Sequence, residues 1–267
     1  MRRMNLEDDS VFTTVGWDGN KGIFALEEHL IRLEKHANIA GIKFDKKIIL
    51  KIKKKLKYKK YKKINTDSKI KCNKPNGLIT IRLNKNRDVV LSERENEYNK
   101  KCEKIKAITV DVSENLKNNQ GVKLGEHLPY KNALKIAKKF GGNAALIVED
   151  SSIIDGDRAT LMVLDKDGTA WVSSNKFGSI QSITIDLIKE KLIQRGIPII
   201  YGRITTDLIL RASDAIMLGT GLGVTRIYSI DDRVFEFSNS ILFDNASSAF
   251  EEIIQEKWID LDGVETL

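Results

Sequence analysis

The chain has 267 residues, of which 41% are hydrophobic, and it carries a formal net charge of +8. This length allows one or two domains with a sizeable core, and no stretch approaches the roughly 20 apolar residues that span a bilayer. We therefore expect a globular protein with no membrane partner. The first residues lack the apolar centre of a secretory signal, so we expect the protein to be cytoplasmic.

Cysteine and histidine are scarce, which argues against two common kinds of site. Cys72 and Cys102 are too few for a disulfide framework and do not form a zinc-binding pair. We expect both to be free thiols in a reducing compartment. The histidines His29, His36 and His127 share no metal-ligand spacing, so we expect no metal site.

Much of the positive charge is concentrated in one segment. Residues 43–63 hold twelve lysines and one acidic residue, which gives this window +11 and leaves the rest of the chain at −3. Ile48, Ile52 and Leu56 recur there at helical spacing, so we expect an amphipathic helix with a solvated lysine face. Few arginine or aromatic residues are present to read or stack bases, which argues against a nucleic-acid partner. A phosphate-binding patch is the alternative.

The first half of the chain mixes strand and helix patterns. Between residues 26 and 40 the apolar residues recur on one helical face. The polar segment 113–125, with three asparagines and two glycines, has the composition of a linker. We therefore expect domains at 1–115 and 116–267. In order, we expect a strand at 10–17, helices at 26–40 and 45–63, and strands at 77–83, 88–91 and 105–112.

The second half of the chain consists mainly of short strand patterns separated by turns. Gly141 and Gly196 each follow a helical pattern and are typical of helix ends. We expect helices at 129–140, 183–195, 206–212 and 241–258, with strands at 144–149, 152–154, 159–164, 170–173, 198–204, 214–218, 224–230 and 232–237. The predicted fold class is α+β, with a small N-terminal α/β domain and a larger β-rich C-terminal domain.

Five landmarks along residues 10–236 carry the most specific signal. They are VFTT at 11–14 with HLIRL at 29–33, VKL at 122–124 with AKKFG at 137–141, IDGDRATL at 154–161, SITID at 182–186, and ASDAIMLGT at 212–220. In this order the chain resembles the class IV aminotransferases, which have fold type IV and use pyridoxal 5'-phosphate.

The resemblance implies roles for the residues at the matching positions. Lys123 would form a Schiff base with the cofactor aldehyde and later act as a base. Asp155, which follows Lys123 by 32 residues, would keep the pyridine nitrogen of the cofactor protonated. Arg32 would bind the cofactor phosphate as a bidentate cation. Further phosphate donors would come from a helix start and a glycine-rich loop, at Ile183, Thr184, Gly219 and Thr220.

The substrate end of the site is defined by fewer residues. Arg82, on a predicted strand, is a candidate for binding a substrate carboxylate, and Tyr130 and Gly221 are further candidates. We expect His127 to be a wall residue of the pocket. The resemblance also implies a homodimer, since in the family the cofactor site lies at the domain interface and borrows residues from the partner.

Several matching positions differ from the family pattern and leave the reaction open. Asp155 stands where the family has glutamate, Thr160 where it has asparagine, and Ile185 where it has arginine. The leading hypothesis is an aminotransferase acting between an amino acid and a 2-oxo acid. A 4-amino-4-deoxychorismate lyase, which releases pyruvate with the same cofactor, is the first alternative. A degenerate member that binds a phosphorylated ligand without turnover is the second.

Overall fold

The computed structural model describes residues 10–62, 64, 74–99, 104–111, 121–235 and 240–263, and Cys72 and Cys102 lie outside these ranges. Two compact units are present. The first unit comprises Met1–Cys102, Val122–Glu126 and Ile254–Leu267, and the second comprises Glu103–Gly121 and His127–Ile253. The expected domains 1–115 and 116–267 have different bounds, because the first unit ends at Cys102 and two later segments also belong to it.

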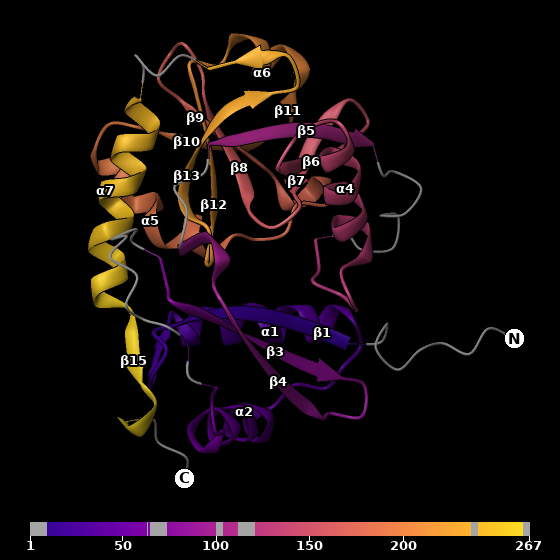
Figure 1. Ribbon diagram of the computed structural model, residues 1–267, viewed down its shortest axis with the longest axis vertical. Helices are drawn as coiled ribbons and strands as arrows, with labels where there is room; N and C mark the ends of the chain where they lie inside the picture. Colours follow the sequence, from indigo (N-terminus) through magenta and orange to yellow (C-terminus); the bar gives the residue numbers. More distant parts are fainter. Residues whose placement is uncertain are drawn as a thin grey trace, which may run out of the picture. The chain divides into compact units, whose positions relative to one another are not determined.

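The first unit is built on an antiparallel sheet of five strands in the order β15-β2-β1-β3-β4 (Figure 1). Ile79, Ile81 and Leu83 alternate along β3 and are fully buried, as expected for a strand with one face on the core. The strands are β1 (Ser10–Trp17), β2 (Gly22–Phe24), β3 (Gly77–Asn84), β4 (Val89–Glu95) and β15 (Trp258–Asp260).

Two helices, α1 (Leu26–Ile39) and α2 (Lys46–Tyr58), complete the core of the first unit. The side chain of Asp45 caps α2 by accepting a hydrogen bond from Ile48 N. The helix ends at Tyr58 instead of the predicted residue 63, because Lys59 has an extended backbone. Figure 1 shows α2 beside β4, and the two elements are in contact.

Two later segments of the chain return to this sheet. Leu124 forms a β-bridge with Val11, so the end of the predicted linker 113–125 is held against β1. At the C-terminus, Trp258 pairs with Phe24 of β2, and their rings lie 5.7 Å apart. The last helix therefore ends at Glu256, two residues before the predicted end.

The second unit holds a ten-stranded mixed sheet. Its order is β10-β9-β8-β12-β13-β5-β6-β7-β11, with β14 paired to β13. Strands β9 and β11 come close to each other although they are far apart in this order, so the sheet curls. The strands are β5 (Ile105–Asp111), β6 (Ala144–Glu149), β7 (Ser152–Gly156), β8 (Thr160–Leu164), β9 (Ala170–Ser173), β10 (Ile199–Gly202), β11 (Ile204–Thr205), β12 (Asp214–Gly219), β13 (Gly223–Ile230) and β14 (Arg233–Val234).

One predicted strand is divided in two. Residues 198–204 form β10 and β11, because β10 pairs with β9 whereas β11 pairs with β7. Helix α4 packs on β5 and β6, and α5 packs on β12 and β10. The remaining helices are α4 (Leu128–Lys139), α5 (Ile183–Gln194), α6 (Thr206–Arg211) and α7 (Ile241–Glu256), with short 3-10 turns η1 (Glu97–Asn99), η2 (Asn175–Phe177) and η3 (Leu261–Gly263).

The described residues contain neither a membrane-spanning helix nor a metal-binding cluster. No helix among them is long and apolar enough to cross a membrane. Likewise, no group of three or more histidine, cysteine, aspartate or glutamate side chains within these ranges could hold a metal ion.

Candidate active site

Lys123 lies in the segment that returns to β1, and its main chain is hydrogen-bonded on both sides. Its carbonyl oxygen accepts a hydrogen bond from Phe12 N at 3.1 Å. Its N–H donates to Nδ1 of His36 at 3.4 Å. The Nζ of Lys123 lies 5.4 Å from the centroid of the Phe12 ring, within the range of a cation–π contact. The lysine backbone is therefore fixed within the first unit.

Three polar side chains share the buried face of α1. His29, Arg32 and His36 are 0%, 6% and 3% exposed. Their positions i, i+3 and i+7 place them on one side of the helix. Arg32 was predicted as a phosphate ligand, whereas His36 was not among the predicted site residues. Polar residues inside an otherwise apolar helical stripe were the signal that could have identified it.

Arg32 is held by a chain of hydrogen bonds that begins at its guanidinium. Its Nη2 donates to Thr13 Oγ1 at 2.9 Å, and this hydroxyl lies 2.7 Å from Nδ1 of His29. Since Thr13 accepts from Arg32, its own hydrogen is available for an uncharged His29. Burial, followed by the charges of Arg32 and Lys123, lowers the pKa of His29 well below its usual value. Arg32 thus lies beside a neutral histidine.

Arg82 already has several partners within the first unit. Its Nη1 donates to Ser10 Oγ at 2.8 Å and to the carbonyl oxygen of Gly125 at 2.6 Å. Its Nη2 lies 3.1 Å from a carboxylate oxygen of Glu126. These contacts fasten β3 to the segment that contains Lys123.

Asp155 is a buried carboxylate of the second unit and faces three donors. Its Oδ1 accepts from Gly156 N at 2.9 Å and from Thr160 Oγ1 at 3.4 Å. Its Oδ2 accepts from Ile180 N at 3.1 Å. The side chain is 4% exposed, so these bonds fix its orientation in a nonpolar setting.

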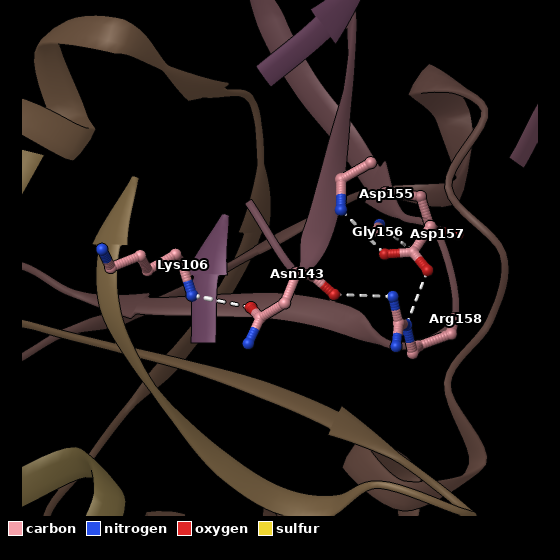
Figure 2. A network of polar contacts seen from close by, with 7 residues as sticks. Lys106, Asn143, Asp155, Gly156, Asp157 and Arg158 are labelled. Atoms are coloured by element: carbon pink, nitrogen blue, oxygen red, sulfur yellow. Dashed lines mark hydrogen bonds and ion pairs between the residues drawn. The ribbon is translucent and has the colours of Figure 1, made fainter. Parts of the chain in front are cut away.

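Asp157, the second carboxylate of the segment 154–161, has different partners (Figure 2). Its oxygens accept from Ala145 N at 2.8 Å and from Arg158 Nε at 2.6 Å. Burial raises the pKa of Asp157, although the neighbouring guanidinium opposes this shift. Arg158 also donates to the carbonyl oxygen of Asn143 at 2.8 Å. Asp157 therefore joins the end of β7 to β6.

Tyr130 lies in the first turn of α4 and is 1% exposed. Its ring stacks on His127 with centroids 3.7 Å apart and an interplanar angle of 8°. Burial raises the pKa of Tyr130 well above its usual value, and the charge of Asp155 adds to this effect. The hydroxyl has no hydrogen-bond partner among the described residues. Such a buried donor is rare and requires an explanation.

The start of α5 offers donors to an anion. The hydroxyl of Ser182 accepts from Ile185 N at 3.3 Å and satisfies that amide. The preceding amides, those of Ile183 and Thr184, have no acceptor within the helix itself. Thr184 is 1% exposed, and its Oγ1 lacks a hydrogen-bond partner in the described part of the chain. A helix N-terminus with a free hydroxyl suits a phosphate group.

The glycine-rich loop is the turn between β12 and β13. Gly219 pairs with Gly223 across the turn, and Gly223 has φ of +63°. A Cβ placed on Gly219 would lie 3.0 Å from Cβ of Ala159, so this position permits a close approach to the start of β8. Thr220 and Gly221, at the tip, are half-buried.

The predicted site residues are divided between the two units. In the second unit, Asp155 accepts a hydrogen bond from the N–H of Ile180, which precedes α5. Asp155 also accepts from Thr160 at the start of β8, and Gly219 lies close to this start. The second unit also contains Tyr130, Ile183, Thr184, Thr220 and Gly221. The first unit contains Arg32, Arg82 and Lys123.

The lysine-rich helix lines a separate groove of about 640 Å³ against edge strand β4. Lys51 Nζ donates to the carbonyl oxygen of Arg87 at 2.9 Å, and Lys55 Nζ donates to that of Val89 at 2.7 Å. Lys59 pairs with Glu93 at 3.0 Å. These lysines cover the exposed edge of the sheet, a common protection against strand-to-strand association.

The family comparison matches most of the chain. The family model described as amino-transferase class IV covers residues 10–230. This confirms the resemblance found in the sequence. No curated protein matches the chain.

Several solved structures share the fold. A branched-chain aminotransferase from Thermoproteus uzoniensis, solved with norvaline, has a TM-score of 0.74 and 17% identity, over 97% of this chain and 94% of that one. A provisional 4-amino-4-deoxychorismate lyase from Legionella pneumophila has a TM-score of 0.72 and 17% identity, over 95% and 96%. The PLP-bound form of a hypothetical aminotransferase from Mycobacterium tuberculosis has a TM-score of 0.71 and 14% identity, over 96% and 93%. The predicted fold type IV architecture is therefore confirmed.

Proposed function

We propose that this chain, which belongs to the class IV aminotransferase family, is a pyridoxal-phosphate-dependent aminotransferase. It would move an amino group between an amino acid and a 2-oxo acid. The observation that carries this proposal is Lys123, whose main chain is hydrogen-bonded on both sides in the unit that also contains buried Arg32. A fixed lysine amine is what covalent attachment of an aldehyde cofactor needs.

The polar atoms of the chain fit pyridoxal phosphate. Thr184 Oγ1 and Tyr130 OH are buried without a partner among the described residues, so each can serve a ligand at no cost to an internal bond. A guanidinium, a helix start and a hydroxyl suit a phosphate, and a buried carboxylate suits a protonated ring nitrogen. When bound, the cofactor supplies an electron sink that stabilises negative charge at the substrate α-carbon.

Lys123 would have two roles, first as the attachment point and then as the proton carrier. In the second role, its free amine would take up the proton from the substrate α-carbon and later release it. Arg32 would anchor the phosphate with paired N–H groups and so hold the reacting carbon in place.

Asp155 would hold a proton on the ring nitrogen. Its three internal donors fix the orientation of the carboxylate. Aspartate is one methylene shorter than the family's glutamate, so the ring would lie closer to β7 or reach the carboxylate through a water. Thr184, Ile183 and the loop residues Gly219 and Thr220 would complete the phosphate site.

Arg82, Tyr130 and Gly221 are proposed substrate contacts with different requirements. Tyr130 has an unused hydroxyl and could donate to a substrate carboxylate directly. Arg82 would have to exchange its contact with Glu126 for the substrate. A carboxylate that replaces Glu126 would keep the charge balance of that pair.

The test is an assay of purified protein with added pyridoxal phosphate. A panel of amino donors is offered with 2-oxoglutarate or pyruvate, and 4-amino-4-deoxychorismate is offered alone. Amino transfer from at least one donor, lost in Lys123→Ala, supports the proposal. Pyruvate release from the chorismate derivative would instead assign the lyase reaction, and cofactor binding without turnover would identify a degenerate member.

We also propose that the protein acts as a homodimer in the cytoplasm, binding small amino-acid and 2-oxo-acid substrates and no nucleic acid. The family resemblance supports the dimer, and light scattering during gel filtration tests it. A monomer that is fully active at nanomolar concentration would contradict this part of the proposal.

A further inference from the structure

His36 is a buried histidine that faces the main chain of Lys123. It lies on α1, is 3% exposed, and its Nδ1 accepts the N–H of Lys123 at 3.4 Å. On the other side of the same residue, the carbonyl oxygen of Lys123 accepts from Phe12 N. The main chain of Lys123 is thus held between a helix and a strand, and a side chain makes the contact on the helix side.

The contact requires an uncharged imidazole. A protonated histidine carries hydrogen on both ring nitrogens and cannot accept from an N–H. The charged groups facing His36 are Arg32 and Lys35 on its own helix and Lys123 on the returning segment, and all three are cations. Burial, followed by these charges, lowers the pKa of His36 to about 3. The imidazole therefore stays neutral, with its hydrogen on Nε2.

We propose that His36 is a positioning residue, which fixes the backbone of Lys123 so that its amine is presented to the cofactor aldehyde. This inference rests on the proposed function and extends it to a residue that does not touch the cofactor. An apolar side chain at this position would leave the N–H of Lys123 without its acceptor, and the segment would shift to find another one.

The experiment compares three variants of the full-length protein. His36→Ala removes the acceptor, whereas His36→Asn keeps one, because the amide oxygen of asparagine can occupy the place of Nδ1. Leu33→Ala is the control, since Leu33 is a fully buried core residue of the same helix. It reports the effect of destabilising α1 without removing the contact to Lys123.

Each protein is saturated with pyridoxal phosphate and reduced with borohydride, which fixes the cofactor on whichever lysine holds it. Peptide mass mapping then gives the share carried by Lys123. We expect this share, and the affinity for the cofactor, to fall about tenfold in His36→Ala. The share should stay near the wild-type value in His36→Asn and Leu33→Ala.

The outcomes separate this inference from the proposed function. Absence of label on Lys123 in the wild type would overturn the proposed function itself. Label on Lys123 that is equal in the wild type and His36→Ala, or reduced equally in His36→Ala and His36→Asn, would overturn the role of His36.

If His36→Ala does not fold, nitrogen NMR of the wild type tests the contact directly. A proton on Nε2 with a bare Nδ1 at pH 5 supports the inference, and a proton on Nδ1 contradicts it.

Discussion

Substitution of Asp155 by asparagine tests the carboxylate without changing its size. Oδ1 accepts from Gly156 N and Thr160 Oγ1, and Oδ2 accepts from Ile180 N. The amide of asparagine keeps one accepting oxygen for Gly156 N and Thr160 Oγ1. Its NH2 group then faces the N–H of Ile180, so two donors meet and that hydrogen bond is lost. Loss of one hydrogen bond to a charged group, in a buried setting, costs about 2 kcal/mol. We therefore expect the melting temperature of the apo protein to fall by roughly 4–8 °C.

Thermal unfolding of the apo protein measures this effect, and Asp207→Asn is the matched control. Asp207 is exposed on α6, so the same change of charge should alter the stability by less than about 0.5 kcal/mol. With cofactor and substrates, Asp155→Asn should lose turnover far more than cofactor affinity, because the ring nitrogen loses its partner. Equal melting temperatures for Asp155→Asn, Asp207→Asn and the wild type would refute the hydrogen-bonding scheme.

Further predictions concern the phosphate site and the buried histidines. Thr184→Val should leave the apo stability nearly unchanged and weaken cofactor binding about tenfold in an equilibrium titration, since its hydroxyl has no hydrogen-bond partner among the described residues. An unchanged affinity would contradict this. Arg32→Lys should weaken the affinity for pyridoxal phosphate by about tenfold or more and the affinity for pyridoxal much less, because the bidentate contact is lost. His29 and His36 both have a lowered pKa, so the unfolded chain binds more protons below about pH 6.5. Unfolding free energy should therefore fall as the pH drops from 6.5, by up to about 1.4 kcal/mol per pH unit for each histidine, and urea titrations should show a shallower fall in His36→Asn.

Local patterns predicted most elements of the fold. The helix that carries Arg32 follows directly from its apolar period, and the strand at 10–17 has the predicted bounds. The errors lie where tertiary pairing decides the outcome. Trp258 continues a helical pattern in the sequence but pairs with Phe24, which is more than 200 residues earlier in the chain. No local property of the sequence around Trp258 predicts this pairing.

The candidate site shows the same limit. The family landmarks predict Lys123 and Asp155 as site residues from their spacing of 32 residues along the chain. The surroundings of these residues were not predicted, because they come from distant segments. His36 contacts Lys123 across 87 residues, and Ile180 contacts Asp155 across 25. Both contacts involve a backbone N–H, a group that every residue except proline carries, so no side-chain motif identifies them.

The most direct test of the central claim is the visible absorbance of the protein after incubation with pyridoxal phosphate and removal of the excess. A lysine-bound cofactor absorbs visible light, so we predict a yellow protein with one cofactor per chain. Lys123→Ala should be colourless, and Lys131→Ala should keep the colour as a matched control on a nearby lysine of α4. A wild type that takes up no cofactor, or a Lys123→Ala variant that keeps the full band, would contradict the claim that Lys123 holds it.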